Sequence, residues 1–320
     1  MEMKRRTMLR GAALAGAAAA TGLAGGLAGA ASASAADTTD VVNGPWLVSV
    51  GWGVLQVNPG RTTPQQLLTE GNDATTSPDG RYVAFVNNAW SSDGRLTPYV
   101  SLLDRVTGGI RRLLADPPGV IYGAPTWSPD GTQLALVIGN DTLIAVDVAT
   151  GGRRVLVQGH SMSGPNWSRD GSMIVVRWVS RSEGPQLRIL EVSTGKLRRI
   201  YLPEAAGEMF DGPVFMPNSE RVVFCTNRWT RDTEVPSGRA LGSVRIDGTG
   251  LKRLTDTPRL YLSPVFSPDG RYCAALSVPP TNEYPDGGNI IVSTSGFGEP
   301  WWIPGDEYVD SSRLDWARAI

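Results

Sequence analysis

The stretch APTWSPDGTQLALV, residues 124–137, decides the fold that we expect for this chain. Its centre, Ser-Pro-Asp-Gly, predicts a tight turn: proline fixes φ, aspartate can bond back to the local backbone, and glycine can take the left-handed conformation. Pro125, before the turn, cannot donate to a strand ladder and therefore predicts a strand at a sheet edge. The apolar run after the turn predicts a strand that is buried on both faces. The stretch is thus expected to form a β-hairpin.

Variants of this hairpin recur along the chain. Their sequences are GPNWSRDGSMIVV (164–176), GPVFMPNSERVVF (212–224), SPVFSPDGRYCAAL (263–276), the partial copy DATTSPDGRYVAF (73–85) and a C-terminal beginning, SSRLDWARA (311–319). The residues two places before the turn proline form one column: Thr76, Trp127, Trp167, Phe215, Phe266 and Trp316. Their spacing of 40 to 51 residues is typical of one four-stranded propeller blade.

Each hairpin is followed by a third strand-like segment, a glycine-containing turn and a fourth strand-like segment. Five complete blades can be counted between residue 73 and about residue 305. Strand-like segments remain at 46–51, 53–58 and 64–70, and one more lies at the C-terminus. We therefore predict an all-β fold, a six-bladed β-propeller of four-stranded antiparallel blades, with the last blade closed by N-terminal strands plus the C-terminal strand. Closure would remove the exposed sheet edges.

W-S-P-D-G before an apolar strand, and VRIDGTGLKRLT (244–255) after FCTNR (224–228), resemble the repeats of the TolB-type propeller family, the PD40 or WD40-like group. The resemblance implies one propeller domain over residues 36–320. It does not name a function, because such propellers serve as scaffolds, periplasmic partners and peptidase accessory domains. Two turns depart from the pattern: Arg169 replaces one proline, and MPNS replaces SPDG at 216–219. The domain that precedes the propeller in the family's TolB protein is not expected here, so the envelope role of that protein is not implied.

Residues 1–35 have the pattern of an export signal. KRRTMLR (4–10) resembles the twin-arginine motif, an uncharged Ala/Gly/Leu stretch follows at 11–30, and small residues at A-x-A spacing predict cleavage near Ala35. An uncleaved anchor is the alternative, since about 20 apolar residues can span a bilayer. Alanine and glycine are only weakly apolar, however, and no cysteine near the cleavage site offers lipid attachment. We expect a twin-arginine (Tat) signal peptide, a secreted or periplasmic location in the cell envelope or outside the cell, and no membrane span after cleavage.

The composition argues against several classes of protein. The chain has 320 residues, 41% of them hydrophobic, and a formal net charge of −1, which is typical of a globular domain and argues against nucleic acid as a partner. Cys225 and Cys273 lie in different strand-like segments. We expect two buried free thiols, because a domain of this size does not depend on disulfides.

The hexapeptide GHSMSG (159–164) is one residue away from the G-x-S-x-G nucleophile elbow. No helix is expected after it, Ser163 stands in place of the second glycine, and His160 is the only histidine of the chain. A triad built on Ser161 would therefore have no histidine elsewhere in the fold as its base. The sequence also contains no C-x-x-C, H-E-x-x-H, Walker or dinucleotide-binding motif. We assign no catalytic residue.

Loops between the second and third strands, and loops between successive blades, should emerge on one face, opposite the S-P-D-G turns. We call this the long-loop face; it includes the insertions at 87–98, 178–186, 227–240 and 279–288. Long loops on a rigid ring are where binding sites tend to lie. The candidate ligand- or partner-binding residues on this face are Trp90, Trp178, Arg228, Trp229, Tyr284, His160, Asp116, Glu208, Asp211, Asp256, Asp306 and Asp310.

Two functions are compatible with this pattern, and the first is favoured. In the first, the chain is a non-enzymatic scaffold, and its long-loop face binds an envelope or extracellular protein or a small ligand. Alternatively, it is a metal-assisted lyase or hydrolase that acts on a carbohydrate or lactone, with a divalent cation such as calcium held by carboxylates at the channel mouth. Loop aspartates also bond to local backbone or simply keep a surface soluble. We therefore assign no metal or cofactor; a purely structural propeller is a third interpretation.

Overall fold

The computed structural model describes residues 43–50, 53–58, 66–90, 96–116, 120–203, 208–230, 238–256, 259–278, 289–294, 301–303 and 311–320. The chain divides into two compact units, Met1–Ser34 and Ala35–Ile320, and all described residues belong to the second unit.

Every regular element among the described residues is a β-strand. The strands are β1 (Asn43–Val50), β2 (Gly53–Val57), β3 (Gln66–Thr69), β4 (Asn72–Thr76), β5 (Tyr82–Trp90), β6 (Leu96–Asp104), β7 (Ile110–Ala115), β8 (Thr126–Trp127), β9 (Gln133–Ile138), β10 (Thr142–Asp147), β11 (Arg153–Gln158), β12 (Ser161–Trp167), β13 (Met173–Ser180), β14 (Gly184–Glu191), β15 (Leu197–Ile200), β16 (Phe210–Phe215), β17 (Arg221–Thr226), β18 (Ala240–Arg245), β19 (Lys252–Arg253), β20 (Leu260–Phe266), β21 (Tyr272–Val278), β22 (Asn289–Thr294), β23 (Trp301–Ile303) and β24 (Ser311–Arg318).

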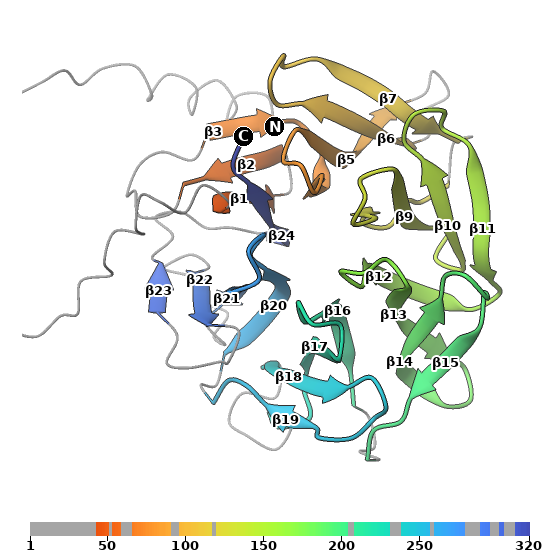
Figure 1. Cartoon of the computed structure of the whole chain (residues 1–320), viewed down its shortest axis with the longest axis vertical. Helices are drawn as coiled ribbons and strands as arrows, with labels where there is room; N and C mark the ends of the chain where they lie inside the picture. Colours follow the sequence, from red (N-terminus) through yellow and green to blue (C-terminus); the bar gives the residue numbers. More distant parts are fainter. Residues whose placement is uncertain are drawn as a thin grey trace, which may run out of the picture. The chain divides into compact units, whose positions relative to one another are not determined.

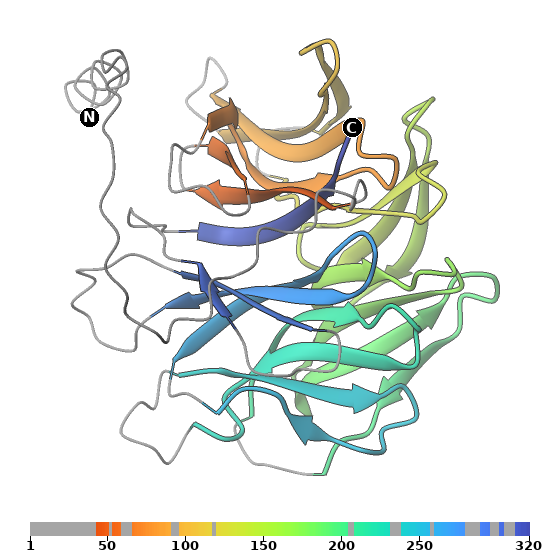
Figure 2. The same ribbon diagram turned by 60° about the vertical axis from the view of Figure 1, so that its left-hand side comes forward.

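The strands form four-stranded antiparallel sheets that are arranged as the blades of a propeller. Their orders are β4-β5-β6-β7, β8-β9-β10-β11, β12-β13-β14-β15, β16-β17-β18-β19, β20-β21-β22-β23 and β24-β1-β2-β3. Figure 1 shows β12, β16, β20 and β24 nearest the centre, with β11, β15 and β19 on the outside. Figure 2 shows the twist of the individual sheets from the side. The predicted all-β propeller of four-stranded antiparallel blades is therefore confirmed.

The two ends of the described chain meet in one sheet. Strand β24 pairs antiparallel with β1, and Trp46 lies opposite Trp316. Their ring centroids are 5.2 Å apart in an edge-on arrangement, and the Trp316 indole N–H donates to the carbonyl of Gly44 at 3.1 Å. The predicted pairing of the C-terminal strand with the N-terminal strands is thus confirmed, and we call β24-β1-β2-β3 the closing sheet.

The core lies between neighbouring sheets. On β5, Ala84 packs toward β9 of the next blade, whereas Phe85 packs toward the closing sheet. On β9, Leu136 belongs to the first of these clusters, and Val137 packs in the other direction against β13. Successive residues of a strand point to opposite faces, so a strand covered on both faces needs an uninterrupted apolar run. This is why the segments after each turn are uniformly apolar.

The S-P-D-G turns are held by side-chain hydrogen bonds within the motif. The Ser128 hydroxyl donates to Asp130 at 2.6 Å, and the Gln133 amide donates to the Ser128 hydroxyl oxygen at 2.9 Å. The Asp130 carboxylate accepts the Thr132 amide at 3.0 Å, and Gly131 has φ +72°. The predicted roles of aspartate and glycine are confirmed. The serine also fixes the turn, which the sequence analysis did not anticipate.

The two cysteines are free and buried, as predicted. Cys225 belongs to the small cluster between β17 and β20, and burial raises the pKa of its thiol. Burial also raises the pKa of the Cys273 thiol to about 12. Neither thiol is therefore an activated nucleophile in the folded chain.

Candidate functional site

The structure describes most of the predicted binding residues. Tyr284, Asp306 and Asp310 lie outside the described residues. Trp90 is the last residue of β5, where its backbone pairs with Leu96; its side chain is not described. All but one of the remaining predicted residues fall into three local arrangements on the long-loop face, and Trp229 lies apart from them.

The first arrangement is a stack on Trp178. The imidazole of His160 lies parallel to the Trp178 indole with ring centroids 4.5 Å apart, and the guanidinium carbon of Arg188 is 4.6 Å from the indole centroid. Trp178 itself is only 4% exposed and packs with Met162 in the core, whereas His160 is exposed. Trp178 thus provides a rigid base, and the ring and the cation that contact it form the accessible surface.

A polar chain continues from this stack to the hairpin between β13 and β14. The Gln186 side-chain oxygen accepts from Arg188 at 3.0 Å, and its amide nitrogen donates to Glu183 at 2.5 Å. Arg199 forms an ion pair with the same carboxylate at 3.3 Å. Gln186 is only 2% exposed. Its buried amide therefore links Arg188 to Glu183. The position of Arg188 is therefore fixed by both stacking and hydrogen bonding.

The second arrangement is a buried ion pair. Arg228 donates to Glu208 at 2.7 Å and to the carbonyl of Pro203 at 2.8 Å, and the Thr226 hydroxyl donates to Glu208 at 3.1 Å. The Glu208 side chain is 5% exposed. Breaking such a pair leaves an uncompensated charge in the interior. Arg228 and Glu208 therefore hold the segment before β16 in place.

Trp229 also has a structural contact. A Cβ atom added to Gly242 of β18 would lie 3.0 Å from two ring atoms of Trp229, so the indole rests directly on the backbone of that glycine. The glycine leaves the space that the ring occupies. Trp229 is partly exposed, and it covers the sheet as well as contributing to the surface.

The third arrangement consists of separate acid–arginine pairs. Asp116 accepts from Arg153 at 2.7 Å and from the Tyr122 hydroxyl. Burial acts to raise the pKa of Asp116, but these hydrogen bonds outweigh it and lower the pKa. Asp211 pairs with Arg239 at 3.0 Å, and Asp256, whose side chain is 96% exposed, lies 3.5 Å from Arg253. Within the described part of the chain, no three His, Cys, Asp or Glu residues form a group that could hold a metal ion.

The hexapeptide GHSMSG leads into a strand. Ser161 is the first residue of β12, and it pairs with Val179 of β13. A nucleophile elbow requires a strand, a tight turn and a helix in that order. The hexapeptide therefore does not present Ser161 as an elbow would.

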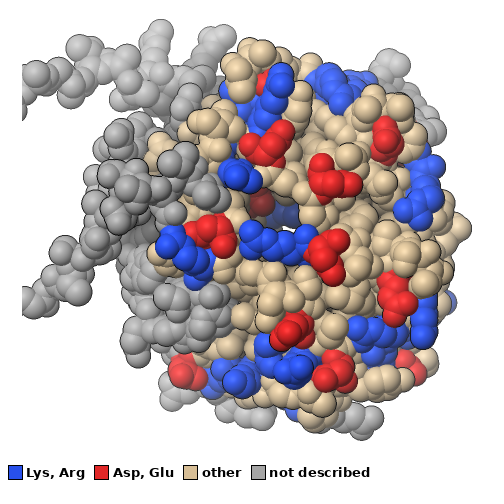
Figure 3. All heavy atoms as spheres, in the orientation of Figure 1, with Lys and Arg blue, Asp and Glu red and all other residues tan. Residues whose placement is uncertain are grey.

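Polar groups close to the axis of the propeller were not predicted from the sequence. Asp315 of β24 accepts from the Thr76 amide at 2.9 Å and from the Thr76 hydroxyl at 2.7 Å. On the same strand, Arg313 donates to the carbonyl of Pro125 at 3.0 Å. Burial raises the pKa of Asp315, and it also raises the pKa of Asp73 on β4. Seen along this axis in Figure 3, the surface is hollowed at its centre, with acidic and basic side chains at the edge of the hollow.

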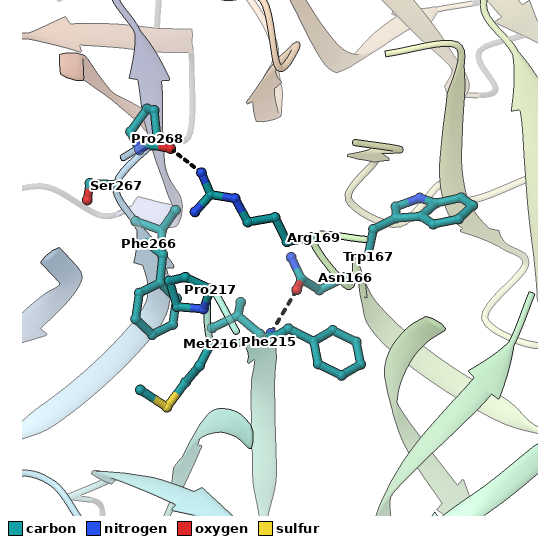
Figure 4. A pocket seen from close by; sticks show the side chains of 11 residues that line it. Asn166, Trp167, Arg169, Phe215, Met216, Pro217, Phe266, Ser267 and Pro268 are labelled. Atoms are coloured by element: carbon teal, nitrogen blue, oxygen red, sulfur yellow. Dashed lines mark hydrogen bonds between the residues drawn. The ribbon is translucent and has the colours of Figure 1, made fainter. Parts of the chain in front are cut away.

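A pocket on the side of the S-P-D-G turns, which we call the turn face, was not predicted either. The pocket lies between β12, β16 and β20, and Arg169 extends across it toward Pro268 (Figure 4). The Arg169 amide donates to the Ser219 hydroxyl oxygen at 3.2 Å. The two turns whose sequences depart from the motif therefore contact each other. Arg169 and the MPNS turn at 216–219 both depart from the S-P-D-G pattern, and they lie in neighbouring blades. This was the signal in the sequence that could have pointed to the pocket.

Comparisons with known proteins agree with this architecture. The model of the PD40 family, the TolB beta propeller domain, matches residues 65–272, which is more than half of the chain. No curated protein matches the sequence. Along the described segments, no helix is long and apolar enough to cross a membrane.

Solved structures show the same fold at low sequence identity. TolB from Acinetobacter baumannii has a TM-score of 0.66 at 16% identity; the match covers 86% of this chain and 66% of that protein, slightly less than two thirds. A TolB-like structure from Agrobacterium tumefaciens has a TM-score of 0.59 at 17% identity, covering 83% of this chain and 91% of that one. An oligogalacturonate lyase in complex with manganese has a TM-score of 0.57 at 18% identity, covering 83% of this chain and 74% of the lyase.

Proposed function

The chain belongs to the TolB β-propeller domain family, and from this premise we propose that it is an exported, six-bladed binding module that acts in the cell envelope or outside the cell. The six four-stranded sheets and the β1–β24 pairing support the closed six-bladed ring. The KRRTMLR run at residues 4–10 supports export by the twin-arginine route with cleavage near Ala35. The partner is an envelope or extracellular protein, or a small ligand, that contacts the long-loop face.

The stack on Trp178 is the observation on which this proposal rests. His160 is exposed, yet its ring is held against a buried indole, and Arg188 is fixed on the same indole and by Gln186. Aromatic and arginine side chains are the types that dominate binding energy at protein interfaces. Side chains that are already ordered lose little conformational entropy when a partner binds. A prearranged histidine and arginine on a rigid strand therefore favour a binding surface.

Under this proposal, residues that would contact a partner differ from residues that support the fold of this face. His160 and Arg188 can be changed without creating a buried charge. Arg228 holds the buried carboxylate of Glu208, and Trp229 covers Gly242, so changes at these two positions would alter stability as well as binding. We therefore place the test on the Trp178 stack.

The test is a pull-down from the cell envelope with wild-type protein, the double variant His160→Ala/Arg188→Gln, and a control double variant, Arg154→Gln/Lys252→Gln. Both control positions are exposed on outer strands. We expect the control to recover the same partner as the wild type, with binding of that purified partner weakened at least about tenfold in the His160/Arg188 variant. Equal affinity of the two double variants would refute the proposed face.

A metal-assisted lyase or hydrolase is the second candidate, because one similar structure is an oligogalacturonate lyase in complex with manganese. The likeness at 18% identity concerns the fold. In the described part of the chain, Asp116, Asp211 and Asp256 each lie beside an arginine of their own. Elemental analysis of the purified protein, with thermal unfolding in calcium, manganese and EDTA, tests this candidate: a stoichiometric metal that stabilises the fold would favour it over the binding module.

A further inference from the structure

The pocket on the turn face has a volume of about 220 Å³ and is formed by three consecutive blades. Its apolar wall includes Phe215, Met216 and Phe266, and its polar residues include Asn166 and Arg169. Figure 4 shows Arg169 passing over the space between these groups, with its guanidinium directed toward Pro268. Pockets for drug-sized ligands measure about 300–1,000 Å³, so this pocket is suited to a smaller molecule.

Arg169 is not required by the turn in which it lies. Proline is the residue that best fits this position of a type I turn. The corresponding positions of four other turns are Pro78, Pro129, Pro217 and Pro268. The remainder of the turn is intact: the Ser168 hydroxyl donates to Asp170 at 2.6 Å, as in the other copies. The side chain of Arg169 therefore takes no part in the hydrogen bonds that hold its own turn.

Within the described residues, Arg169 forms no ion pair, although the Asp269 carboxylate is near enough to interact with its charge. Its guanidinium donates to the carbonyl of Pro268 at 3.1 Å, a neutral acceptor. The Asp269 carboxylate accepts from Arg271 at 2.6 Å and from Asn43 at 2.9 Å, so its hydrogen bonds go to those groups and not to Arg169. The guanidinium can therefore offer further N–H donors to an anion.

Asn166 adds a second donor at the same place. Its side-chain oxygen accepts the Phe215 amide at 2.9 Å, which fixes the orientation of the amide group. The side-chain nitrogen consequently faces the other way, and in Figure 4 it points toward the Arg169 side chain. The pocket thus combines two donors, one of them cationic, with a wall of aromatic and aliphatic groups.

We propose that this pocket binds a carboxylate attached to a small apolar group. The guanidinium of Arg169 and the amide nitrogen of Asn166 hold the carboxylate oxygens, and the apolar group lies against Phe266 and Met216. Guanidinium–carboxylate hydrogen bonds are strong and directional, and burial of the apolar group supplies the rest of the affinity. The site is on the opposite face from the Trp178 stack, so a test of this pocket is independent of a test of the proposed function.

The test uses isothermal titration calorimetry and saturation-transfer NMR on the folded full propeller with phenylacetate as the probe. Phenylacetamide and acetate are the matched controls, because the first lacks the charge and the second lacks the apolar group. The variants are Arg169→Pro, which restores the motif of the other turns but removes the amide that donates to Ser219, and Arg169→Gln, which removes the charge and keeps that amide. The two variants should bind phenylacetate equally weakly. Arg154→Gln is the control for loss of a surface arginine.

We expect saturable binding of phenylacetate to the wild type and to Arg154→Gln, with at least about tenfold weaker binding to Arg169→Pro, as for loss of a charge-assisted hydrogen bond. Phenylacetamide and acetate should each bind at least about tenfold more weakly than phenylacetate. The tripeptide Gly-Gly-Phe distinguishes the source of the carboxylate: Arg169-dependent binding tighter than that of phenylacetate would assign the site to a peptide end. Absence of phenylacetate binding, or equal binding by Arg169→Pro, would overturn the proposal.

Discussion

Asp315 offers a direct test of how the closing sheet is fastened to the next blade. Its carboxylate lies on β24 and accepts from the Thr76 amide at 2.9 Å and from the Thr76 hydroxyl at 2.7 Å, both on β4. In the variant Asp315→Ala these bonds are lost, and the Thr76 amide loses its acceptor. An unsatisfied buried donor costs about 1–3 kcal/mol, and hydrogen bonds to a charged group contribute about 1.5–3 kcal/mol. Relief from burying the carboxylate offsets part of this loss, so we expect the free energy of unfolding to fall by about 2–4 kcal/mol at pH 7.

The pH dependence provides a second measurement on the same residue. Burial raises the pKa of Asp315 in the folded protein, although the hydrogen bonds from Thr76 oppose the shift. The folded state then binds the proton more tightly than the unfolded state, so this group makes the protein less stable as pH rises from about 4, the pKa of an unfolded aspartate, through the raised folded value. Asp315→Asn removes that titration. The stability of this variant relative to wild type should therefore improve as pH rises through the window.

The assay is urea unfolding followed by tryptophan fluorescence at several pH values between 4 and 8. Asp256→Ala is the control, because its side chain is 96% exposed and its removal should cost less than about 0.5 kcal/mol. Burial also raises the pKa of Asp73, the other aspartate near the axis. Asp73 is unchanged in every variant, so its titration largely cancels when the stabilities of the variants are compared. If Asp315→Ala cost no more than the control, the carboxylate would not fasten β24 to β4, and the argument from its hydrogen bonds would be refuted.

Three further predictions concern other parts of the fold. Gly248→Ala should destabilise the protein by at least about 3 kcal/mol in thermal unfolding, because Gly248 has φ +90° and the new Cβ would lie 2.5 Å from the Tyr201 carbonyl oxygen. The control Gly195→Ala, at φ +70° with nothing within 4 Å of the new Cβ, should cost only about 1–2 kcal/mol. Equal losses in the two variants would contradict the steric argument. Arg228→Ala should cost about 3–5 kcal/mol in urea unfolding because it leaves the buried Glu208 carboxylate unpaired, and adding Glu208→Gln should restore part of the loss; no recovery would show that the charge is not the cause. The two thiols should react with a disulfide reagent at pH 8 only after unfolding, because both are buried and the pKa of Cys273 is raised to about 12, whereas rapid reaction of native protein would disprove their burial.

The repeat made the sheets predictable from the sequence. A turn with proline, aspartate and glycine fixes where two strands meet, and uniformly apolar runs such as LALV show that both faces are covered. The pairing of β24 with β1 followed by counting, because one strand at one end complemented three at the other. The serine of the turn was harder to interpret, since its role depends on the distance from Ser128 to Asp130.

The candidate site was predictable only in part. Chain order placed the long loops on one face, but it could not show that Trp178 would be buried beneath His160, or that Glu208 would be held by Arg228. These contacts join residues from different strands and loops, and no local pattern specifies them. The turn-face pocket was missed for a related reason: Arg169 and Ser219 come together only because two blades stand side by side.

The antiparallel pairing of β1 with β24 also governs the order in which the molecule can be assembled. Trp46 and its partner Trp316 are 270 positions apart in the sequence, so Trp316 is translated long after Trp46. The intervening blades can each form as their hairpins emerge, but β1 must wait with one edge exposed until β24 arrives. Pairing of β1 with β24 is thus a later event in biosynthesis than formation of the hairpins between them, and a chain that lacks β24 would keep an unpaired strand edge on β1, which favours aggregation.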